Sequence, residues 1–573
     1  MCALSNMYAL DQAKKEILLS LKKALGKTYS VTPDMLVTPP KPEYGDLSFP
    51  CFDLAKGMKR NPAEIAIELS AKMAPMPLVP KITALGPYVN FTFDDVAFTE
   101  HVLSDISKMK ARYGKSTTGK GKKVLVEYVN FNTHKEVHVG HLRNLTLGKA
   151  VVNILRMNGF DVTPVSYIND LGNNVARCLW GLIHLHPGEE PQGDKLNFLG
   201  RVYTEATLAI GEDEAKRAQV SEIQRKLENM EGDVVPLWKK THKWSMDGMK
   251  EIFGDFALEL DKIYLEHEII ADTHEIVKRL LTEGIARVSE GAVIVDLEAE
   301  GLGVNLLRKS DGTLLYNAKD LALAYRKETD YAADRSIIVV DARQALAFKQ
   351  LSATLKRMDF PREVIHLAFD FVTLPEGAMS SRKGNIVRWT ELRDAMKEKL
   401  VESTKTRHPE WRVRKIEATA RALTYSAVTF MMLRQDPDKI ITFDMDEAMA
   451  TDGFTGPYLL YTIARIESIK KKAPMKLLSA PALLTHEKER ELMRLLAKYP
   501  LILAQAGAQY RPSTIAQYGF DLAQKFAGYY EVARIIDESN PELSGARLAL
   551  ADAVRQVLAN LCEVLGLVIV KEM

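Results

Sequence analysis

The feature that most constrains this chain of 573 residues is a strand that runs into a histidine-containing turn and then into a helix. Val124 to Val129 are mostly apolar and predict a buried strand, and Leu142 to Met157 carry apolar residues at helical spacing. His138, Gly140 and His141 therefore lie at the helix start, where free N–H groups and the helix dipole favour phosphate. Because Gly140 has no Cβ, a purine or ribose can approach the backbone. The segment predicts a nucleoside triphosphate site.

The imidazoles of His138 and His141 can donate hydrogen bonds to phosphate oxygens as negative charge builds up at phosphorus. Two other interpretations stay open: the histidines could be satisfied within a core, or they could bind zinc. His134, His138 and His141 follow an i, i+4, i+7 spacing that would share one face of a continuous helix. Lys135 would place a cation inside such a zinc site, and no cysteine or carboxylate nearby offers a convincing fourth ligand. We therefore predict no metal site.

A second segment, Ala378 to Asn385, is rich in serine, glycine and cationic residues and follows the apolar run Val364 to Leu374. Such a composition suits a loop that closes over phosphates, although by itself it is equally typical of a solvated turn. Its pairing with the histidine turn favours the phosphate interpretation.

With both segments in this order, the chain resembles a class I aminoacyl-tRNA synthetase, and within that class the arginyl-tRNA synthetase family. His138 to His141 match the first signature of the class, HIGH, and Met379 to Asn385 match a form of the second, KMSKS, found in many arginyl enzymes. The resemblance covers nearly the whole chain. Further matching segments are Tyr44 to Asp46, Gly86 to Asn90, Tyr167 to Asp170, Leu315 to Asp320, and the terminal Glu572 and Met573.

The second signature departs from its full pattern, because Ala378 and Ser381 stand where the pattern has lysines. Arginyl enzymes with this altered loop tend to carry a lysine three residues before the first histidine, and this chain has Lys135 there. Leaving pyrophosphate demands a nearby cation, which either segment could present; Lys135 as a plain surface lysine remains the alternative. The resemblance implies a catalytic set of Lys135, His138, His141, Met379, Ser380, Arg382 and Lys383, with Lys135, His138, Gly140, His141 and Met379 binding ATP.

A pocket selective for arginine needs carboxylates and fixed acceptors, because a guanidinium keeps its charge and donates in a planar fork. Glu127 and Asp320 are plausible carboxylates on residue type alone, and a carboxylate inside a strand such as Glu127 is costly unless paired. Asp320 could instead cap the helical run Leu321 to Tyr325. By resemblance, Asn132 holds the α-amino or carboxylate end of the substrate. Tyr316 and Gln344 complete the side-chain pocket, with core packing the alternative for Tyr316.

The expected fold is multidomain α/β. Alternating strands and helices, including strands at Ala292 to Leu297 and Ser336 to Asp341, predict a Rossmann-type doubly wound catalytic domain. An α+β domain precedes it, and an all-α anticodon-binding bundle follows. The expected boundaries are 1–115 for the N-terminal domain, 116–395 for the catalytic domain with a helical insertion at about 196–265, 396–455 for a helical connector, and 456–573 for the bundle.

Contacts with tRNA follow from the resemblance. Tyr88 and Asn90 match positions that touch the D-loop, and Tyr530 and Met573 match positions that hold the anticodon loop, where aromatic rings stack on unpaired bases. Tyr88 as a buried strand end and Tyr530 as bundle core stay open. The cationic stretch Lys405 to Arg421 suits RNA phosphates and a solvated helix face equally well.

Composition sets broader limits. A net charge of +2 means that any nucleic-acid surface must be a local patch. Four cysteines without CxxC spacing favour a reducing compartment and argue against structural zinc or disulfides. No apolar run approaches the roughly 20 residues that span a bilayer. We therefore expect a cytoplasmic protein without membrane contact, and a monomer.

The resemblance implies an arginine–tRNA ligase that uses ATP with Mg²⁺, forms arginyl adenylate, and transfers arginine to the terminal adenosine of tRNA(Arg). Three alternatives stay open at this point: another class I synthetase such as the cysteinyl enzyme, a nucleotidyltransferase of the same superfamily, and a non-catalytic RNA-binding paralogue.

Overall fold

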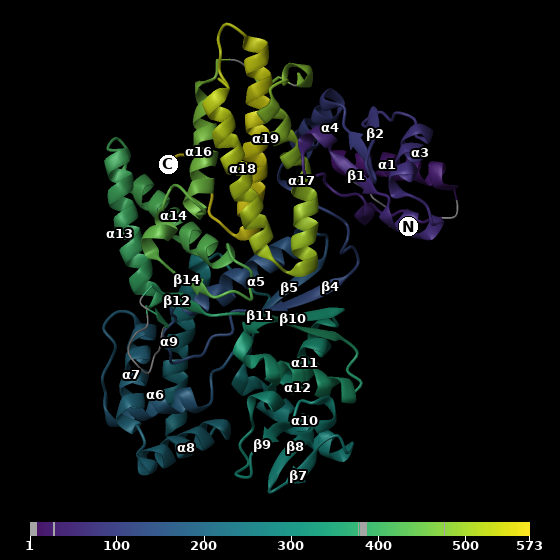
Figure 1. Cartoon of the computed structure of the whole chain (residues 1–573). Helices are drawn as coiled ribbons and strands as arrows, with labels where there is room; N and C mark the ends of the chain where they lie inside the picture. Colours follow the sequence, from purple (N-terminus) through teal and green to yellow (C-terminus); the bar gives the residue numbers. More distant parts are fainter. Residues whose placement is uncertain (1–7, 27–28, 376, 379–386, 475, 479) are drawn as a thin grey trace.

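The computed structural model describes residues 8–26, 29–375, 377–378, 387–474, 476–478 and 480–573. A parallel sheet lies at the middle of the molecule (Figure 1). A long helical bundle, drawn in yellow and green, stands on one side of it, with the N-terminal elements in purple beside the bundle. Two further groups of elements, α6 to α9 and α10 to α12, lie on the opposite side.

The central sheet is entirely parallel and has the strand order β11-β10-β4-β5-β6. Its middle strands are continuous apolar runs because helices cover both faces. The chain passes from β4 to β5 in one direction and from β10 to β11 in the other, so the order reverses between β4 and β10. A crevice at such a reversal is where doubly wound sheets bind ligands. The elements are β4 (Lys123–Glu127), α5 (Val139–Met157), β5 (Asp161–Ile168), β6 (Lys262–Leu265), α11 (Tyr316–Tyr331), β10 (Arg335–Asp341), α12 (Ala345–Arg357) and β11 (Glu363–Phe369).

Two excursions interrupt this sheet. Four helices between β5 and β6 share their own apolar core: α6 (Asn173–His184), α7 (Lys195–Ile210), α8 (Glu214–Glu228) and α9 (Val234–Asp255). Between β6 and β10 lie a short helical turn, η5 (Glu266–Ile269), the helix α10 (Ile270–Thr282), and an antiparallel sheet of β7 (Arg287–Ser289), β8 (Ala292–Asp296) and β9 (Val304–Arg308).

The predicted strand at Ala292 to Leu297 exists as β8, but it was wrongly assigned to the doubly wound sheet. The reason is the two-residue turn before it. Glu290 and Gly291 both have positive φ, 49° and 79°, as in the tight turns that join antiparallel strands. The turn pairs β8 with β7 and removes it from the parallel order.

The N-terminal part is α+β, as expected. Its antiparallel sheet has the order β1-β3-β2, covered by helices. Arg494, on a helix of the C-terminal bundle, forms ion pairs with Asp46 and, at 2.7 Å, with Asp95, and so fastens this part to the bundle. The elements are α1 (Ala9–Leu25), β1 (Leu47–Pro50), α2 (Phe52–Met58), α3 (Pro62–Lys72), β2 (Lys81–Leu85), β3 (Tyr88–Thr92) and α4 (Asp95–Met109).

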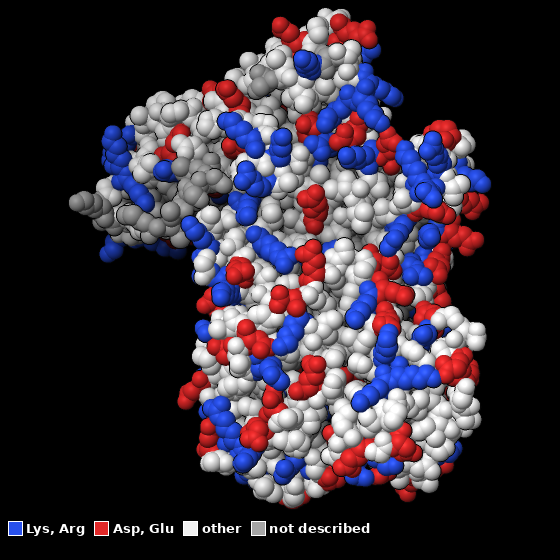
Figure 2. Space-filling model, turned by 180° about the vertical axis from the view of Figure 1, so that it is seen from behind, with Lys and Arg blue, Asp and Glu red and all other residues white. Residues whose placement is uncertain are grey.

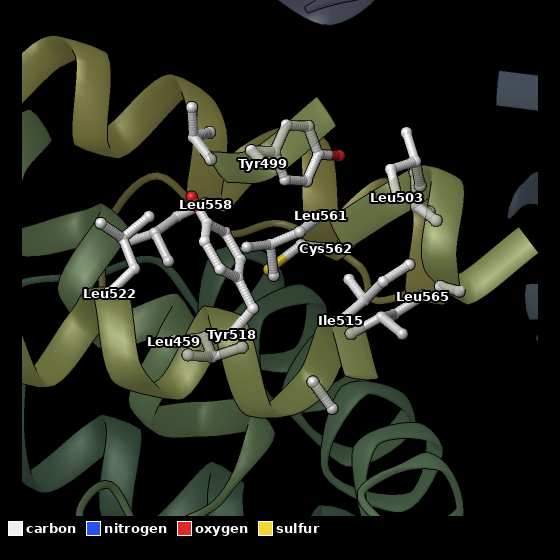
Figure 3. Packing of buried hydrophobic residues seen from close by; sticks show 14 of the residues in the cluster. Leu459, Tyr499, Leu503, Ile515, Tyr518, Leu522, Leu558, Leu561, Cys562 and Leu565 are labelled. Atoms are coloured by element: carbon white, nitrogen blue, oxygen red, sulfur yellow. The ribbon is translucent and has the colours of Figure 1, made fainter. Parts of the chain in front are cut away.

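After the central sheet the chain is nearly all helical. Figure 3 shows how apolar side chains from four long helices, α16 to α19, interdigitate in the bundle core, with Tyr518 and Leu561 fully or almost fully buried. The elements are β12 (Val372–Leu374), β13 (Gly377–Ala378), α13 (Trp389–Arg407), α14 (Val413–Leu433), β14 (Ile441–Thr442), α15 (Met445–Met449), α16 (Gly456–Lys472), α17 (Glu487–Gln509), α18 (Pro512–Val532) and α19 (Pro541–Leu565).

Surface charge of both signs is mixed on the face shown in Figure 2, with no large area of one sign. This agrees with the net charge of +2. Among the described helices, none is both long and apolar enough to cross a membrane.

One buried arginine joins the sheet to the segments that follow it. Arg143 on α5 is 1% exposed, and its guanidinium donates five hydrogen bonds of 2.6 to 3.2 Å to backbone carbonyls. Two of these carbonyls belong to Asp370 and Phe371, just before β12, and the others to Asp436, Pro437 and Lys439, just before β14. Because β12 precedes the second-signature segment in the chain, Arg143 fixes the strand that comes before that segment.

We expect Arg143→Ala to destabilise this junction by roughly 3 kcal/mol, because several buried carbonyls lose a charged donor. Amide hydrogen exchange should accelerate in β12 and β14 while the N-terminal sheet keeps its protection. Arg414→Ala, at an exposed position on α14, is the matched control and should leave exchange unchanged. Equal protection of β12 and β14 in both variants would refute this role.

Candidate functional site

A cavity of about 720 Å³ opens at the point where the strand order reverses. It is bounded by the ends of β4, β5 and β10, the turn before α5, the start of α11, and residues 369–372. Side chains predicted from distant parts of the sequence meet here. The predicted residues that line it are Glu127, Asn132, Lys135, His138, Gly140, His141, Tyr316, Asp320 and Gln344. The predicted residues Met379, Ser380, Arg382 and Lys383 lie outside the described residues.

A strained turn brings the chain from β4 into the cavity. Val129 has φ of 63°, a conformation that β-branched residues rarely adopt. Its N–H donates to Asn144 Oδ1 at 2.5 Å, and its carbonyl accepts from Ser166 Oγ at 2.9 Å. Asn144 Nδ2 in turn donates to the carbonyl of Val339 on β10 at 2.5 Å. These hydrogen bonds stabilise the strained residue and fix the ends of β4 and β10 relative to each other.

The two imidazoles of the first signature cap the start of α5. His138 Nδ1 accepts a hydrogen bond from the N–H of Gly140, and His141 Nδ1 accepts one from the N–H of His138, each at 3.1 Å. A neutral ring that accepts at Nδ1 carries its proton on Nε2. Both rings, whose centroids lie 3.8 Å apart, therefore have Nε2–H as their remaining donor.

Both rings are uncharged at neutral pH. Burial, with the neighbouring charge of Lys135 as a smaller cause, lowers the pKa of His138 to about 4. Burial and the neighbouring His138 and Lys135 lower the pKa of His141 well below its usual value. Neutral donors beside a cation suit phosphate, because they bind oxygen without adding charges that repel each other.

The zinc interpretation of the three histidines is wrong. The helix begins at Val139, so His134 is not on it. His134 is fully buried and bonds through Nδ1 to Thr133 and through Nε2 to Thr241 of α9. It is a core histidine that holds the turn against the inserted helices.

Lys135 is half-buried and lines the same cavity as His138 and His141. Its Nζ lies 4.8 Å from the centroid of the Tyr203 ring on α7, within the range of a cation–π contact. The contact holds the ammonium group against the inserted helices, and its charge is close enough to His138 and His141 to lower the pKa of both rings.

Below the cavity, α11 carries a buried group of charges. Lys327 Nζ lies 2.7 Å from Glu127 Oε2, and Lys319 Nζ lies 2.5 Å from Glu266 Oε1, and all four side chains are at most 5% exposed. Asp320, between the two lysines in sequence, forms no hydrogen bond or ion pair with any described residue. The group contains the three carboxylates of Glu127, Glu266 and Asp320 and two lysine ammonium groups. When all five are ionised, its net charge is −1. Among the described residues, this group of charges therefore lacks one cation.

The environment of Asp320 follows from this imbalance. Burial, and to a lesser degree the neighbouring Glu127, raise the pKa of Asp320 to about 7. The capping interpretation of Asp320 is wrong, because α11 begins four residues earlier at Tyr316.

The core-packing interpretation of Tyr316 is also wrong, because its side chain is 49% exposed and lines the cavity.

Sequence reasoning missed two lining residues that the motif Tyr167 to Asp170 already contained. The hydroxyl of Tyr167 and Oδ1 of Asn169 are buried and lack a hydrogen-bond partner among the described residues. Asn169 Nδ2 donates to Asn132 Oδ1 at 3.3 Å. Buried polar atoms that face a cavity without partners are suited to bind the polar groups of a ligand. Their position at the end of β5, a parallel strand, was the available signal.

The predicted tRNA contacts lie on other surfaces. Tyr88, 36% exposed, and the buried Asn90 line a cavity of about 530 Å³ beside the N-terminal sheet. Tyr530 is half-buried on α18, and the guanidinium carbon of Arg465 lies 4.2 Å from its ring centroid. Met573 lines a pocket of about 260 Å³ between α13, Leu423 of α14 and residues 449–452.

Comparisons with known proteins cover nearly all of the chain. Three family models match: the arginyl tRNA synthetase N terminal domain at residues 11–93, the class I (R) tRNA synthetase catalytic domain at 102–444, and the DALR anticodon binding domain at 459–573. The chain is 38% identical to an arginine–tRNA ligase of Bdellovibrio bacteriovorus, over 96% of this chain and 97% of the relative. It is 31% identical to one of Treponema denticola, over 91% and 92%. The solved Thermus thermophilus arginyl-tRNA synthetase superposes with a TM-score of 0.81 at 26% identity, over 98% of this chain and all of that one.

The hydrogen bonds to Nδ1 predict how the two histidine rings titrate. In protein labelled with ¹⁵N-histidine, both rings should be Nε2–H tautomers and His138 should stay neutral down to about pH 5, because burial lowers its pKa to about 4. Ring ¹⁵N shifts measure both properties. His138→Asn and His141→Asn assign the signals, and exposed His274 is the reference ring. A protonated Nδ1 on either ring at pH 7 would contradict the arrangement.

Proposed function

Because the chain belongs to the class I arginyl-tRNA synthetase family, and so joins arginine to tRNA with ATP, we propose that arginine is activated in the cavity between β4 and β10. The observation that carries this proposal is that Asp320 lines the cavity and has no ion-pair partner among the described residues, so its group of buried charges is one positive charge short. A guanidinium supplies that charge and keeps it at all relevant pH values. The cavity is also large enough for an amino acid beside a nucleotide.

In this proposal Asp320 accepts the guanidinium, and Glu127 contributes its negative field although Lys327 already pairs with it. Tyr316 covers the aliphatic part of the substrate and Gln344 closes the side-chain pocket. Asn132, fixed by its hydrogen bond from Asn169, holds the α-amino or carboxylate end. The buried hydroxyl of Tyr167 is a further partner for the guanidinium or amino group.

The arginine carboxylate then attacks the α-phosphate of ATP in line, which forms arginyl adenylate and releases pyrophosphate. His138 and His141 donate Nε2–H bonds to the phosphate chain, Gly140 lets the nucleotide approach, and Lys135 stabilises the charge on pyrophosphate. Met379, Ser380, Arg382 and Lys383 join from the second signature. The described lining offers no group of three carboxylates or imidazoles that could hold a metal ion alone, so we expect Mg²⁺ to enter with ATP, bound to its phosphates.

The second step transfers arginine to the 2′-hydroxyl of the terminal adenosine of tRNA(Arg). We propose contacts of Tyr88 and Asn90 with the D-loop and of Tyr530 and Met573 with the anticodon loop. The exposed edge of Tyr88 and the half-exposed ring of Tyr530 leave aromatic surface on which a base can stack.

The proposed parts are an N-terminal domain at 1–115, a catalytic domain at 116–395 with an insertion at about 196–265, a connector at 396–455 and an anticodon-binding bundle at 456–573. One chain carries the cavity and both regions proposed to contact tRNA, which supports action as a monomer. Its role in protein synthesis supports a cytoplasmic location.

Pyrophosphate exchange tests the function and the role of Lys135 together. We expect exchange with arginine alone among the amino acids, only when tRNA(Arg) is bound. Lys135→Ala should lower kcat at least about 100-fold with little change in KM for arginine, because it removes charge stabilisation from the transition state. Lys239→Ala, at an exposed position on α9, is the control. RNA binding without any exchange would instead identify a non-catalytic paralogue.

Arginine affinity should depend on pH through Asp320. The carboxylate form binds the guanidinium, so affinity is full above the pKa of about 7 and is lost as the pH falls through it. We expect the Kd for arginine to rise about tenfold from pH 8 to pH 6, with proton release on binding at pH 7. Calorimetry in buffers of different ionisation enthalpy measures both.

Asp320→Asn should weaken arginine binding by roughly 10- to 100-fold and flatten its pH dependence, because the charged partner is gone. Asp53→Asn, exposed on α2, should keep the wild-type profile. A wild-type Kd that is constant between pH 6 and pH 8 would show that Asp320 does not hold the guanidinium.

A further inference from the structure

Beneath the cavity, two histidines and an aspartate from three separate segments converge. Asp170 follows β5, His242 lies on α9, and His267 lies in η5. Asp170 Oδ2 is 2.5 Å from His267 Nδ1 and 3.0 Å from His242 Nε2, and the three ligand atoms all lie within 4.8 Å of one another. No other group of this kind occurs among the described residues.

We propose that Asp170, His242 and His267 bind a divalent transition-metal ion such as Zn²⁺. Two imidazole nitrogens and one carboxylate oxygen are a donor set that zinc and its neighbours accept, with a fourth position left for water. This proposal departs from the sequence-based expectation of no metal, which considered only cysteines and the histidines near α5.

The surroundings of the group resemble a prepared binding site. Nε2 of His242 is buried and has no hydrogen-bond partner among the described residues, although it lies 3.0 Å from Asp170 Oδ2. The second oxygen of Asp170 accepts the backbone N–H of His267 at 3.0 Å, which orients the carboxylate. Such outer hydrogen bonds are typical around metal ligands.

Trp238, also on α9, adds to this shell. Its indole N–H donates to the carbonyl of Asp170 at 2.9 Å, and its ring centroid lies 5.2 Å from each of the two imidazoles. The ring therefore packs beside both histidines and covers one side of the group.

The required rearrangement is small. A tetrahedral ion with bonds of about 2.0 to 2.1 Å separates its ligand atoms by about 3.4 Å. The two Asp170 contacts, at 2.5 and 3.0 Å, must therefore lengthen by about 1 Å or less, and the two imidazole nitrogens already lie within 4.8 Å of each other. Asp170 is fully buried, whereas the side chains of His242 and His267 are 17% and 26% exposed. The imidazoles can therefore move while the carboxylate stays.

Such an ion would join the inserted helices to the central sheet next to the arginine cavity. Asn169, beside Asp170, lines the cavity, and Glu266, beside His267, pairs with Lys319, the neighbour in sequence of the lining residue Asp320. The ion would therefore stabilise the fold at the base of the cavity, with no part in the reaction.

Metal content of the purified full chain tests the proposal. After incubation with equimolar Zn²⁺ and desalting, plasma mass spectrometry should find about one equivalent in the wild type and under about 0.2 in His242→Gln and His267→Gln. His274→Gln, exposed on α10, should keep the ion. Equal metal in the wild type and in both cluster variants would overturn the proposal and leave a hydrogen-bonded aspartate.

A second measurement does not depend on the folding of any variant. Zn²⁺ should raise the melting temperature of the wild type, and Co²⁺ in its place should give the visible absorption of a tetrahedral site. Absence of both effects in the wild type would equally overturn the proposal. Arginine-dependent pyrophosphate exchange, run in parallel, reports separately on the catalytic cavity.

Discussion

One turn of α5 holds the catalytic region together. His141 caps the helix and faces the cavity, Arg143 binds the carbonyls that precede β12 and β14, and Asn144 joins β4 to β10 across the point where the strand order reverses. A crevice between diverging strands would otherwise expose unpaired backbone groups. Because Asn144 satisfies them from both sides, the crevice stays open for a ligand without loss of rigidity. The strained Val129 is tolerated for the same reason.

The sequence predicted this region well because its signals are local. A strand, a turn and a helix in succession predicted a phosphate-binding end, and the family resemblance, confirmed by the comparisons, supplied the residues predicted for an arginine pocket, which line one cavity. The doubly wound fold and the helical bundle were also confirmed. The strand at Ala292 to Leu297 was assigned to the wrong sheet because its apolar composition indicates only that it is buried. Its partner strand is decided by the turn at Glu290 and Gly291.

Other features could not be predicted because they depend on contacts between distant segments. Lys319 and Lys327 are ordinary helix residues in sequence, and only the fold shows that they neutralise Glu266 and Glu127. The start of α11 at Tyr316 was likewise not predictable, and it shows that Asp320 lies inside the helix and does not cap it. The group around Asp170 has no recognisable spacing, since its members come from three segments over nearly a hundred positions of the chain.

The two buried ion pairs on α11 have an evolutionary consequence. Replacing one member of such a pair alone leaves an isolated charge in the interior, at a cost of about 3 to 5 kcal/mol, whereas exchanging both for apolar residues can be nearly neutral. Glu127 and Lys327 are separated by 200 positions in sequence, but a substitution at one of them changes the cost of a substitution at the other. Among related sequences, drift at these two sites should be concerted, so that a chain lacking the lysine also lacks the glutamate.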